Sequence, residues 1–319
     1  MRLSDMGERA VVSELLKKFG IGDVDDCAYI SVGGKILAIT SDTVGVETHM
    51  VPGASYADFG WYACAVSMSD LASAGAKPVA IVSNFTLPPE FDLGDTLSIA
   101  EGVNDCARHF GCRVVGGDTK EGKSANVGIT AIGIVDGRPM KRSDARVGDV
   151  VAITGEIGRA YSAILKIREG VWGKDEVYDV MRPMPRIYEG IKLAEFAHAC
   201  IDISDGVYIS AHYIADASGV GIEIYRDDIP LCDRIMKMCE KGRASIDDAL
   251  AYGGDFELMI TIPEDMVRDA MAVLDTLTVI GRVVDKNLGK VLIVDGEKRP
   301  LPLAGYEHFK HGDKGGCKR

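Results

Sequence analysis

Eight aspartates of this chain share one sequence setting, because each follows an apolar run and has a small or hydroxylated residue close by. They are Asp25, Asp26, Asp42, Asp70, Asp118, Asp202, Asp205 and Asp255. A carboxylate at the end of a buried strand is costly to ionise unless another group neutralises it. Few basic residues lie close by in sequence, so a shared set of hard divalent cations is the simplest neutraliser. Since Mg²⁺ in proteins usually arrives with phosphates, the pattern predicts a magnesium and phosphate site.

Hydroxyl groups beside these carboxylates strengthen the prediction. Asp42 lies between Ser41 and Thr43, and comparable pairs are Ser69-Asp70, Asp118-Thr119 and Ser204-Asp205. Carboxylates and hydroxyls are both hard oxygen ligands. Two unit charges 4 Å apart repel by about 4 kcal/mol at an effective dielectric near 20, so clustered carboxylates require a cation. The alternative for any single aspartate is a surface turn or a helix cap, since Asp favours both.

Residues 117–124, GDTKEGKS, match the pattern GxxxxGK[ST] of phosphate-cradling loops. A strand precedes the segment, but the residues that follow it, ANVGITAIGIVDG, indicate a strand and not a helix. No helix N-terminus would then face the phosphates, and Asp118 and Glu121 would place negative charge in the loop. We therefore reject this interpretation and keep the segment as a source of Asp118.

The bulk properties exclude several classes of protein. A formal charge of −12 argues against nucleic-acid binding, which depends on basic patches. The longest uncharged stretches reach about a dozen residues, short of the roughly 20 that a membrane helix needs. The N-terminus is charged and lacks an apolar signal core. The eight cysteines form no CxxC pair, which indicates structural thiols in a reducing compartment and predicts a cytoplasmic location.

The elements that must position the aspartates form an α+β pattern. The first half is predicted as helix, strand, strand, helix, strand, helix, strand, strand, with a β-hairpin at Gly33 and Gly34. A second section begins near residue 147, where helices (159–169, 186–198, 205–218 and 264–275) alternate with strands. At 319 residues the chain is long enough for two domains, which we expect at 1–140 and 147–309. Residues 310–319 are polar and Gly-rich and are predicted to be a disordered tail.

Several motifs taken in order resemble those of the thiamine-monophosphate kinase family. They are GDVDDCA, LAITSDTVGVETHM, ACAVSMSDLASAGAKP, VVGGDTKEG, RSDARVGD, RPMPR, CIDISDGV and GYEHF. The match runs from about residue 20 to residue 309, and the combination of motifs is specific. The family belongs to the superfamily of ATP-binding enzymes that includes aminoimidazole ribonucleotide synthetase.

The resemblance implies a fold and an activity. The N-terminal domain would be a ferredoxin-like α+β domain whose sheet pairs with that of a second subunit in a barrel-like homodimer core. A C-terminal α/β domain would follow, with the active site between the domains. The implied reaction transfers the γ-phosphoryl group of ATP to thiamine monophosphate with the help of several Mg²⁺ ions, giving thiamine diphosphate and ADP. No nucleic acid or membrane partner is expected.

The resemblance also implies roles for individual residues, with none acting as a side-chain catalyst beyond metal binding and positioning. The implied Mg²⁺ ligands are Asp26, Thr40, Ser41, Asp42, Asp70, Asp118, Asp202 and Asp205. The implied ATP contacts are Gly117, Asp118, Arg142 and Ser204. The implied substrate contacts are His49 and Tyr306. From the residues alone, Arg142 could equally be a solvated linker charge, His49 a surface loop residue and Tyr306 a packing residue. Asp25 and Asp255 remain weaker neighbours.

Two departures from the family pattern concern the acceptor. Where the family has a Glu that faces the thiamine end of the substrate, this chain has Gly254, and Ala304 replaces a frequent Trp. Asp255 and Glu257 lie nearby, but their spacing puts neither in the missing position. A different acceptor within the same superfamily therefore remains an alternative, as do a magnesium-dependent hydrolase and a non-catalytic nucleotide or metal sensor. A reactive C-terminal cysteine is a feature of some relatives, and Cys317 resembles it weakly.

Overall fold

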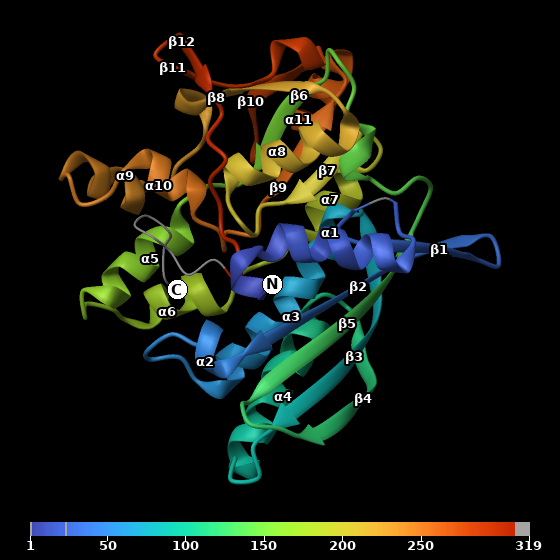
Figure 1. The fold of residues 1–319 in the computed structure, drawn as a ribbon, viewed down its shortest axis with the longest axis vertical. Helices are drawn as coiled ribbons and strands as arrows, with labels where there is room; N and C mark the ends of the chain where they lie inside the picture. Colours follow the sequence, from blue (N-terminus) through green and yellow to red (C-terminus); the bar gives the residue numbers. More distant parts are fainter. Residues whose placement is uncertain (1, 23, 310–319) are drawn as a thin grey trace.

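A computed structural model describes residues 2–22 and 24–309 of the chain. It contains two sheets, which lie in the lower and upper halves of the molecule in Figure 1. The first has five strands in the order β1-β2-β5-β3-β4, and the second has seven in the order β12-β11-β8-β10-β6-β9-β7. The α+β, two-domain expectation is confirmed. The barrel-like dimer core and the domain limits stay predictions.

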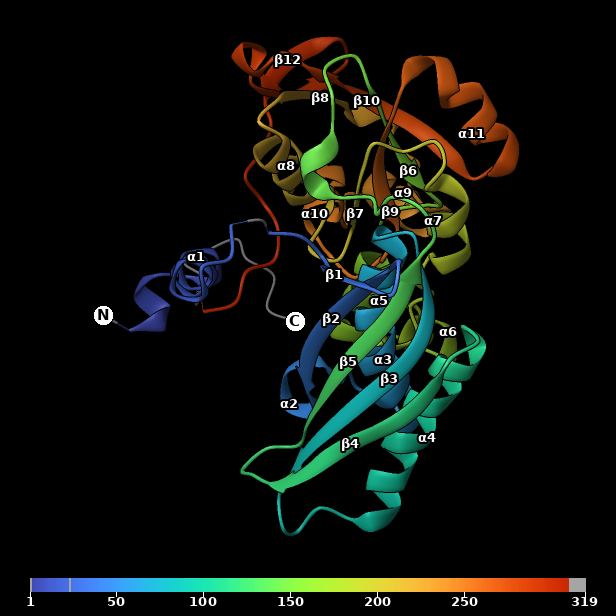
Figure 2. The same cartoon turned by 90° about the vertical axis from the view of Figure 1, so that its right-hand side faces the viewer.

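The N-terminal sheet has one face covered by helices. Its strands are β1 (Ala28–Val32), β2 (Lys35–Gly45), β3 (Ala76–Leu87), β4 (Arg113–Glu121) and β5 (Asn126–Val135). Helices α3 (Tyr56–Ser73) and α4 (Leu93–His109) pack on one face, and α2 (Val46–His49) follows β2 (Figure 2). Every second residue of β5 is buried toward the helices and the others are half exposed. The sheet therefore keeps one face that no described helix covers.

Close packing of α3 on α4 depends on two glycines. A Cβ on Gly60 would collide with the carbonyl oxygen of Ile99, and one on Gly102 would collide with that of Ala57. The backbones of the two helices therefore touch directly. The start of α3 is fixed by Ser55, whose hydroxyl accepts from the backbone N–H of Asp58, and the Asp58 carboxylate accepts from the Ser55 N–H in return.

The C-terminal domain surrounds its sheet with short helices. Its strands are β6 (Val150–Thr154), β7 (Ala199–Asp202), β8 (Gly221–Tyr225), β9 (Leu258–Ile262), β10 (Leu277–Val284), β11 (Lys290–Val294) and β12 (Glu297–Pro300). Its helices are α5 (Arg159–Arg168), α6 (Lys174–Met181), α7 (Ile187–Leu193), α8 (Val207–Ser218), α9 (Asp233–Glu240), α10 (Ile246–Ala251) and α11 (Val267–Val273). Every residue of β7 and β9 is buried, so both faces of the sheet are covered at this end, although β7 is the edge strand.

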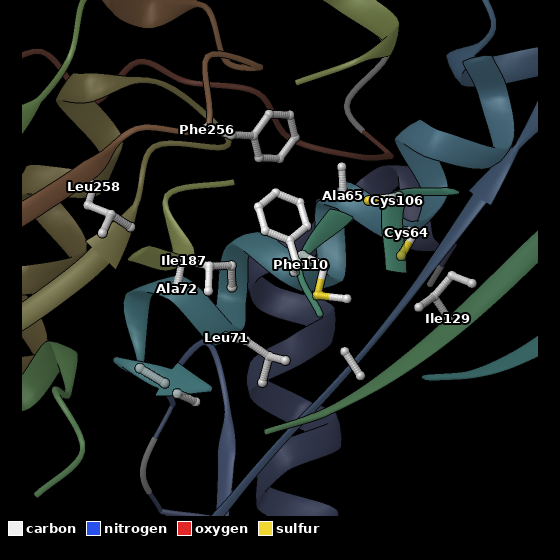
Figure 3. Close-up of a cluster of buried hydrophobic side chains, with 14 of the residues drawn as sticks. Cys64, Ala65, Leu71, Ala72, Cys106, Phe110, Ile129, Ile187, Phe256 and Leu258 are labelled. Carbon is white, nitrogen blue, oxygen red and sulfur yellow. The ribbon is translucent and has the colours of Figure 1, made fainter. Parts of the chain in front are cut away.

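The cores of the two domains are continuous, and α3 is the element they share. Phe256 and Leu258 of the C-terminal domain join the same buried cluster as Leu71 and Ala72 of α3 (Figure 3). Helix α7 packs on α3 so closely that a Cβ on Gly190 would collide with the carbonyl oxygen of Ala72. The carboxylates of α3 are thereby held rigidly against the C-terminal domain.

The remaining elements include α1 (Glu8–Phe19), which lies apart from the five-stranded sheet in Figure 2. Its start is tied to the C-terminal segment, because the backbone N–H of Glu8 donates to the carbonyl oxygen of His308. The short 3₁₀ helices are η1 (Leu3–Asp5), η2 (Arg142–Asp144), η3 (Arg226–Asp228), η4 (Glu264–Met266) and η5 (Lys286–Leu288). Among the helices of residues 2–22 and 24–309, none combines the length and apolar character needed to cross a membrane.

Several local predictions can be compared with the structure directly. The hairpin at Gly33 and Gly34 is confirmed, since β1 pairs antiparallel with β2 around it. The segment 117–124 is followed by β5, so no helix follows it and the rejection of a phosphate-cradling loop is confirmed. The sequence prediction missed α2, α6, α9, α10, β7 and β12. The predicted tail, with Cys317, lies outside the described residues.

Candidate functional site

Three aspartates from distant parts of the sequence meet where the two domains join. Asp26 precedes β1, Asp70 lies near the end of α3, and Asp202 ends β7. Each offers a carboxylate oxygen, and these oxygens lie within 4.8 Å of one another. Asp42 of β2 joins the group through an interaction with the Asp70 carboxylate. Four of the predicted ligands thus lie together.

Hydroxyl groups orient two of these carboxylates. The Thr40 hydroxyl donates to Oδ2 of Asp70 at 2.5 Å, and the Ser67 hydroxyl donates to Oδ2 of Asp42 at 2.7 Å. Thr40 was predicted as a ligand from the family resemblance, and its side chain does lie at the cluster. Ser67 was not predicted. Its position three residues before Asp70 on α3, on the same side of the helix, is the signal that could have found it.

Asp202 is held in the same way by two serines. The Ser69 hydroxyl donates to Oδ2 of Asp202 at 2.7 Å, and the Ser204 hydroxyl donates to Oδ1 at 3.1 Å. Ser69 is adjacent to Asp70 in sequence, but its hydroxyl contacts Asp202. Consecutive residues of a helix point in different directions, so the Ser69 side chain contacts an aspartate of the other domain.

Burial and mutual repulsion both disfavour ionisation of these carboxylates. Burial, with the charge of Asp26, raises the pKa of Asp202 to about 7 and that of Asp25 to about 7. Burial, together with the charges of Asp42 and Asp202, raises the pKa of Asp70 well above its usual value. Burial also raises the pKa of Asp42. Asp70 and Asp202 therefore hold protons near neutral pH unless cations replace them.

Arg142 is the basic group of this cluster and not a solvated linker charge. Its guanidinium is buried and pairs with Asp26, while its backbone N–H donates to Oδ1 of Asp25 at 3.3 Å. Within the described residues, Oδ2 of Asp26 and Nε of Arg142 are buried without a hydrogen-bond partner. One arginine leaves the set with excess negative charge and an orphaned carboxylate oxygen. This donor set fits a hard divalent cation.

The loop after β7 connects the cluster to the backbone at Gly254 and at Tyr306. The carbonyl oxygen of Ser204 accepts from the backbone N–H of Gly254 at 2.9 Å, and that of Asp205 accepts from the N–H of Tyr306 at 3.1 Å. At Gly206 the backbone has a φ of 113°, and an added Cβ would lie 2.8 Å from the backbone of Ala251. Only glycine suits this turn into α8.

Asp118 lies on the opposite face of the N-terminal sheet from Asp42. Strand pairing puts Asp118 beside Asn84, Asn84 beside Gly128, and Gly128 beside Thr43, so these four residues form one row. Side chains alternate between faces along a strand, so Thr43 and Asp42 point in opposite directions. The row crosses three strand gaps, about 14 Å in all. A single chain does not bring Asp118 to the cluster.

Ser41 and Gly117 also differ from the central ligands. The Ser41 hydroxyl lies 3.0 Å from that of Thr130, on the sheet face that no described helix covers. Gly117 lies on β4 beside Ser83, and a Cβ there would collide with the Ser83 carbonyl oxygen. Glycine at 117 is therefore required by close strand approach within the sheet.

A cavity of about 400 Å³ lies between α2, α3, α5 and the loop at residues 252–254. His49 lines it, and its Nδ1 lies 2.7 Å from the Thr48 hydroxyl. The His49 ring is 5.9 Å from that of Tyr62, which also lines the cavity, and 6.4 Å from that of His308. Tyr306 stacks edge-on against His308 at 4.8 Å. The two predicted substrate contacts are thus joined through His308, which was not predicted.

The cavity and the acidic cluster lie along the same helix, α3, and are linked through the loop at residues 252–254. Tyr62 of the cavity precedes Asp70 by eight residues on α3, which corresponds to about 12 Å along the helix. The loop that closes the cavity is bonded to Ser204 through Gly254, and Ser204 also donates to Asp202. A ligand with an anionic end and an aromatic end would fit this arrangement.

Comparisons with known proteins agree with this architecture. Residues 24–135 match the family model of the AIR synthase related protein N-terminal domain, and residues 146–294 match that of the C-terminal domain. Fold and site together therefore define an AIR synthase related protein.

More specific similarity comes from whole chains. A thiamine-monophosphate kinase of Pyrococcus horikoshii is 30% identical over 98% of this chain and 99% of its own. That of Escherichia coli K12 is 35% identical over 95% of each chain. The structure of AaThiL complexed with AMPPCP and TMP superposes with a TM-score of 0.86 at 28% identity, covering 97% of this chain and 99% of that one. The chain belongs to the thiamine-monophosphate kinase family.

Proposed function

We propose that this protein transfers the γ-phosphoryl group of ATP to the phosphate of thiamine monophosphate, forming thiamine diphosphate and ADP. The observation that carries the proposal is the buried set of carboxylates from both domains, connected along α3 to a partly aromatic cavity. The cluster suits cations with phosphates, and the cavity suits an organic ring. A relative of the same fold has been solved with AMPPCP and TMP, which supports both halves of the proposal.

Asp26, Asp42, Asp70 and Asp202 would hold Mg²⁺, with Thr40 and Asp205 beside them. The bound ions would neutralise the phosphates of both substrates and the charge that develops between them. The donor set supports this assignment because it consists of hard oxygen ligands, and because burial makes ionisation of Asp70 and Asp202 unfavourable without a cation. We assign Arg142 and Ser204 to the nucleotide side, since both contact the carboxylates directly.

The side chains of this site act by binding and positioning. The attacking atom is a phosphate oxygen that is already ionised at neutral pH, so no general base is needed. The main barrier is repulsion between two polyanions, and holding them in line provides most of the catalysis in phosphoryl transfer. The hydroxyls of Thr40, Ser67 and Ser69 orient the carboxylates. The packing of α3 on α7 holds the aspartates of the N-terminal domain in place against those of the C-terminal domain.

We further propose that the protein is a homodimer that pairs through the uncovered face of the N-terminal sheet. This face carries five apolar residues in adjacent strand positions, namely Ile30, Leu37, Ile39, Ile132 and Ile134. Such a surface favours association. Asp118 and Gly117 lie on β4, and two strands, β5 and β3, separate β4 from the strand that carries Asp42. Their predicted role at the nucleotide therefore requires a second copy of the chain. The domains would divide at 1–140 and 147–309.

A cytoplasmic location is part of the same proposal. The seven cysteines that the structure describes are all free, and six of them are buried. Free thiols in this number suit a reducing compartment.

The proposal is tested by a coupled ADP-release assay with ATP, Mg²⁺ and a panel of acceptors. The panel contains thiamine monophosphate, thiamine and aminoimidazole precursors. We expect ADP release that depends on both Mg²⁺ and thiamine monophosphate. Release of ADP without any acceptor would indicate a hydrolase, and a preference for another acceptor would assign the chain a different substrate.

A further inference from the structure

Gly254 lines the wall of the cavity, at the position where the sequence resemblance implies a Glu near the acceptor. Gly254 has a φ of +98°, a backbone conformation that side chains rarely adopt. A Cβ there would lie 3.3 Å from the Cβ of Ala160. This backbone disfavours any residue with a side chain, so the missing carboxylate must come from elsewhere if the site needs one.

Asp255 and Glu257, the two acidic residues that follow Gly254, both bind groups of their own domain. The Asp255 carboxylate accepts from the backbone N–H groups of Gly158 and Ala160 at 2.7 and 2.9 Å, where it caps α5. Neither Asp255 nor Glu257 lines the cavity.

Glu257 is fully buried, and its carboxylate is also bound to groups of its own domain. Its carboxylate accepts from the Thr154 hydroxyl at 2.6 Å and pairs with the guanidinium of Arg186. Removing it from these partners would leave the half-buried Arg186 with only a longer ion pair to Glu189. The structure therefore rules out both neighbours as replacements for the missing carboxylate.

Glu47 is the one carboxylate among the described residues that line the cavity. It lies in the first turn of α2, two residues before His49, and it is exposed. Within residues 2–22 and 24–309 it makes no hydrogen bond or ion pair. Arg168 is the cationic residue of the same wall, and Tyr62 and Tyr252 supply aromatic rings. Of the charged lining groups, only Glu47 attracts a cation.

We propose that Glu47 determines specificity for an acceptor whose ring end is positively charged. This inference rests on the proposed function, because the thiazolium ring of thiamine monophosphate carries a fixed positive charge. The carboxylate would attract that ring, while the tyrosines would contact its faces. Glu47 lines the cavity and is not one of the carboxylates that lie together in the acidic cluster, so it acts on acceptor binding and leaves the nucleotide end unaffected.

The test compares Glu47→Gln with wild type in steady-state kinetics for two acceptors. One is thiamine monophosphate, and the other is 3-deazathiamine monophosphate, which has the same shape with an uncharged ring. We expect Glu47→Gln to raise the KM for thiamine monophosphate about tenfold, the typical effect of losing one charge-assisted contact. The KM for the uncharged analogue, the KM for ATP and kcat should each change less than twofold.

The matched control is Glu101→Gln on the exposed side of α4, which should leave all four constants unchanged. An unchanged KM for thiamine monophosphate in Glu47→Gln would overturn the inference and leave the proposed function standing. An equal rise in KM for both acceptors would also overturn it, because Glu47 would then not distinguish acceptors by the charge of the ring. If wild type formed no thiamine diphosphate, the proposed function itself would fail, and the inference with it.

Discussion

Replacing Asp202 with asparagine should make the metal-free protein more stable while removing its activity. Asp202 is only 3% exposed, and burial raises its pKa from 3.8 to about 7. Because one pKa unit corresponds to about 1.4 kcal/mol, ionising this carboxyl in the folded protein costs about 4 kcal/mol at pH 8. Asparagine removes that cost. Its amide can still bond to Ser69 and Ser204, whose hydroxyls accept as well as donate.

The size of the effect depends on pH. The folded pKa of Asp202 lies above the unfolded one, so the folded state binds more protons and wild-type stability falls as the pH rises through 7. At pH 5.5 the wild-type carboxyl is protonated in the folded state but still ionised in the unfolded state, so about half of the advantage of asparagine remains. We expect Asp202→Asn to exceed wild type by roughly 2–4 kcal/mol at pH 8 and by about 1–2 kcal/mol less at pH 5.5.

The assay is urea unfolding of both proteins in a chelating buffer at the two pH values. Asp105→Asn, on the exposed side of α4, serves as the control and should match wild type. Adding Mg²⁺ at pH 8 should stabilise wild type and have little effect on Asp202→Asn. A variant that is less stable than wild type at pH 8 without metal would refute the reasoning, because Asp202 would then stabilise the fold by itself.

Three further predictions concern pH, packing and assembly. Asp25 and Asp202 each have a folded pKa of about 7, so metal-free stability should fall between pH 6 and pH 8 by about 1.4 kcal/mol per group, and Mg²⁺ should reverse the loss in thermal unfolding. Gly102→Ala would force α4 away from Ala57 and should cost about 1–3 kcal/mol in urea unfolding; unchanged stability would contradict the direct backbone contact. Ile132→Asp places a charge on the uncovered sheet face and should give a monomer in analytical ultracentrifugation where wild type is a dimer; a wild-type monomer would exclude the proposed interface.

The central part of the site could be predicted from sequence because its signal is local. Asp42, Asp70 and Asp202 each end or follow an apolar segment, and such segments become buried strands or helices whose ends meet. Their hydroxylated neighbours are also visible in sequence. Which hydroxyl contacts which carboxylate was not predictable, because the contact between Ser69 and Asp202 depends on how α3 packs against β7.

Other features depended on information that sequence spacing does not contain. The position of Asp118 follows from strand order, which puts β5 and β3 between β2 and β4 and turns its side chain to the opposite face from Asp42. Strand β7 was missed because its four residues are too few to give a periodic signal. Helices α6, α9 and α10 were missed for a similar reason, since each is eight residues or shorter. The role of Glu47 became visible only once the cavity was known.

The central claim is that this site joins Mg²⁺-bound ATP to the phosphate of thiamine monophosphate. Phosphorus NMR of a mixture of the protein, ATP, Mg²⁺ and thiamine monophosphate tests it most directly, because each product has its own resonances. We expect thiamine diphosphate and ADP in equal amounts, no inorganic phosphate, and no reaction when Mg²⁺ is chelated. Inorganic phosphate without thiamine diphosphate, or equal turnover in the chelated sample, would contradict it.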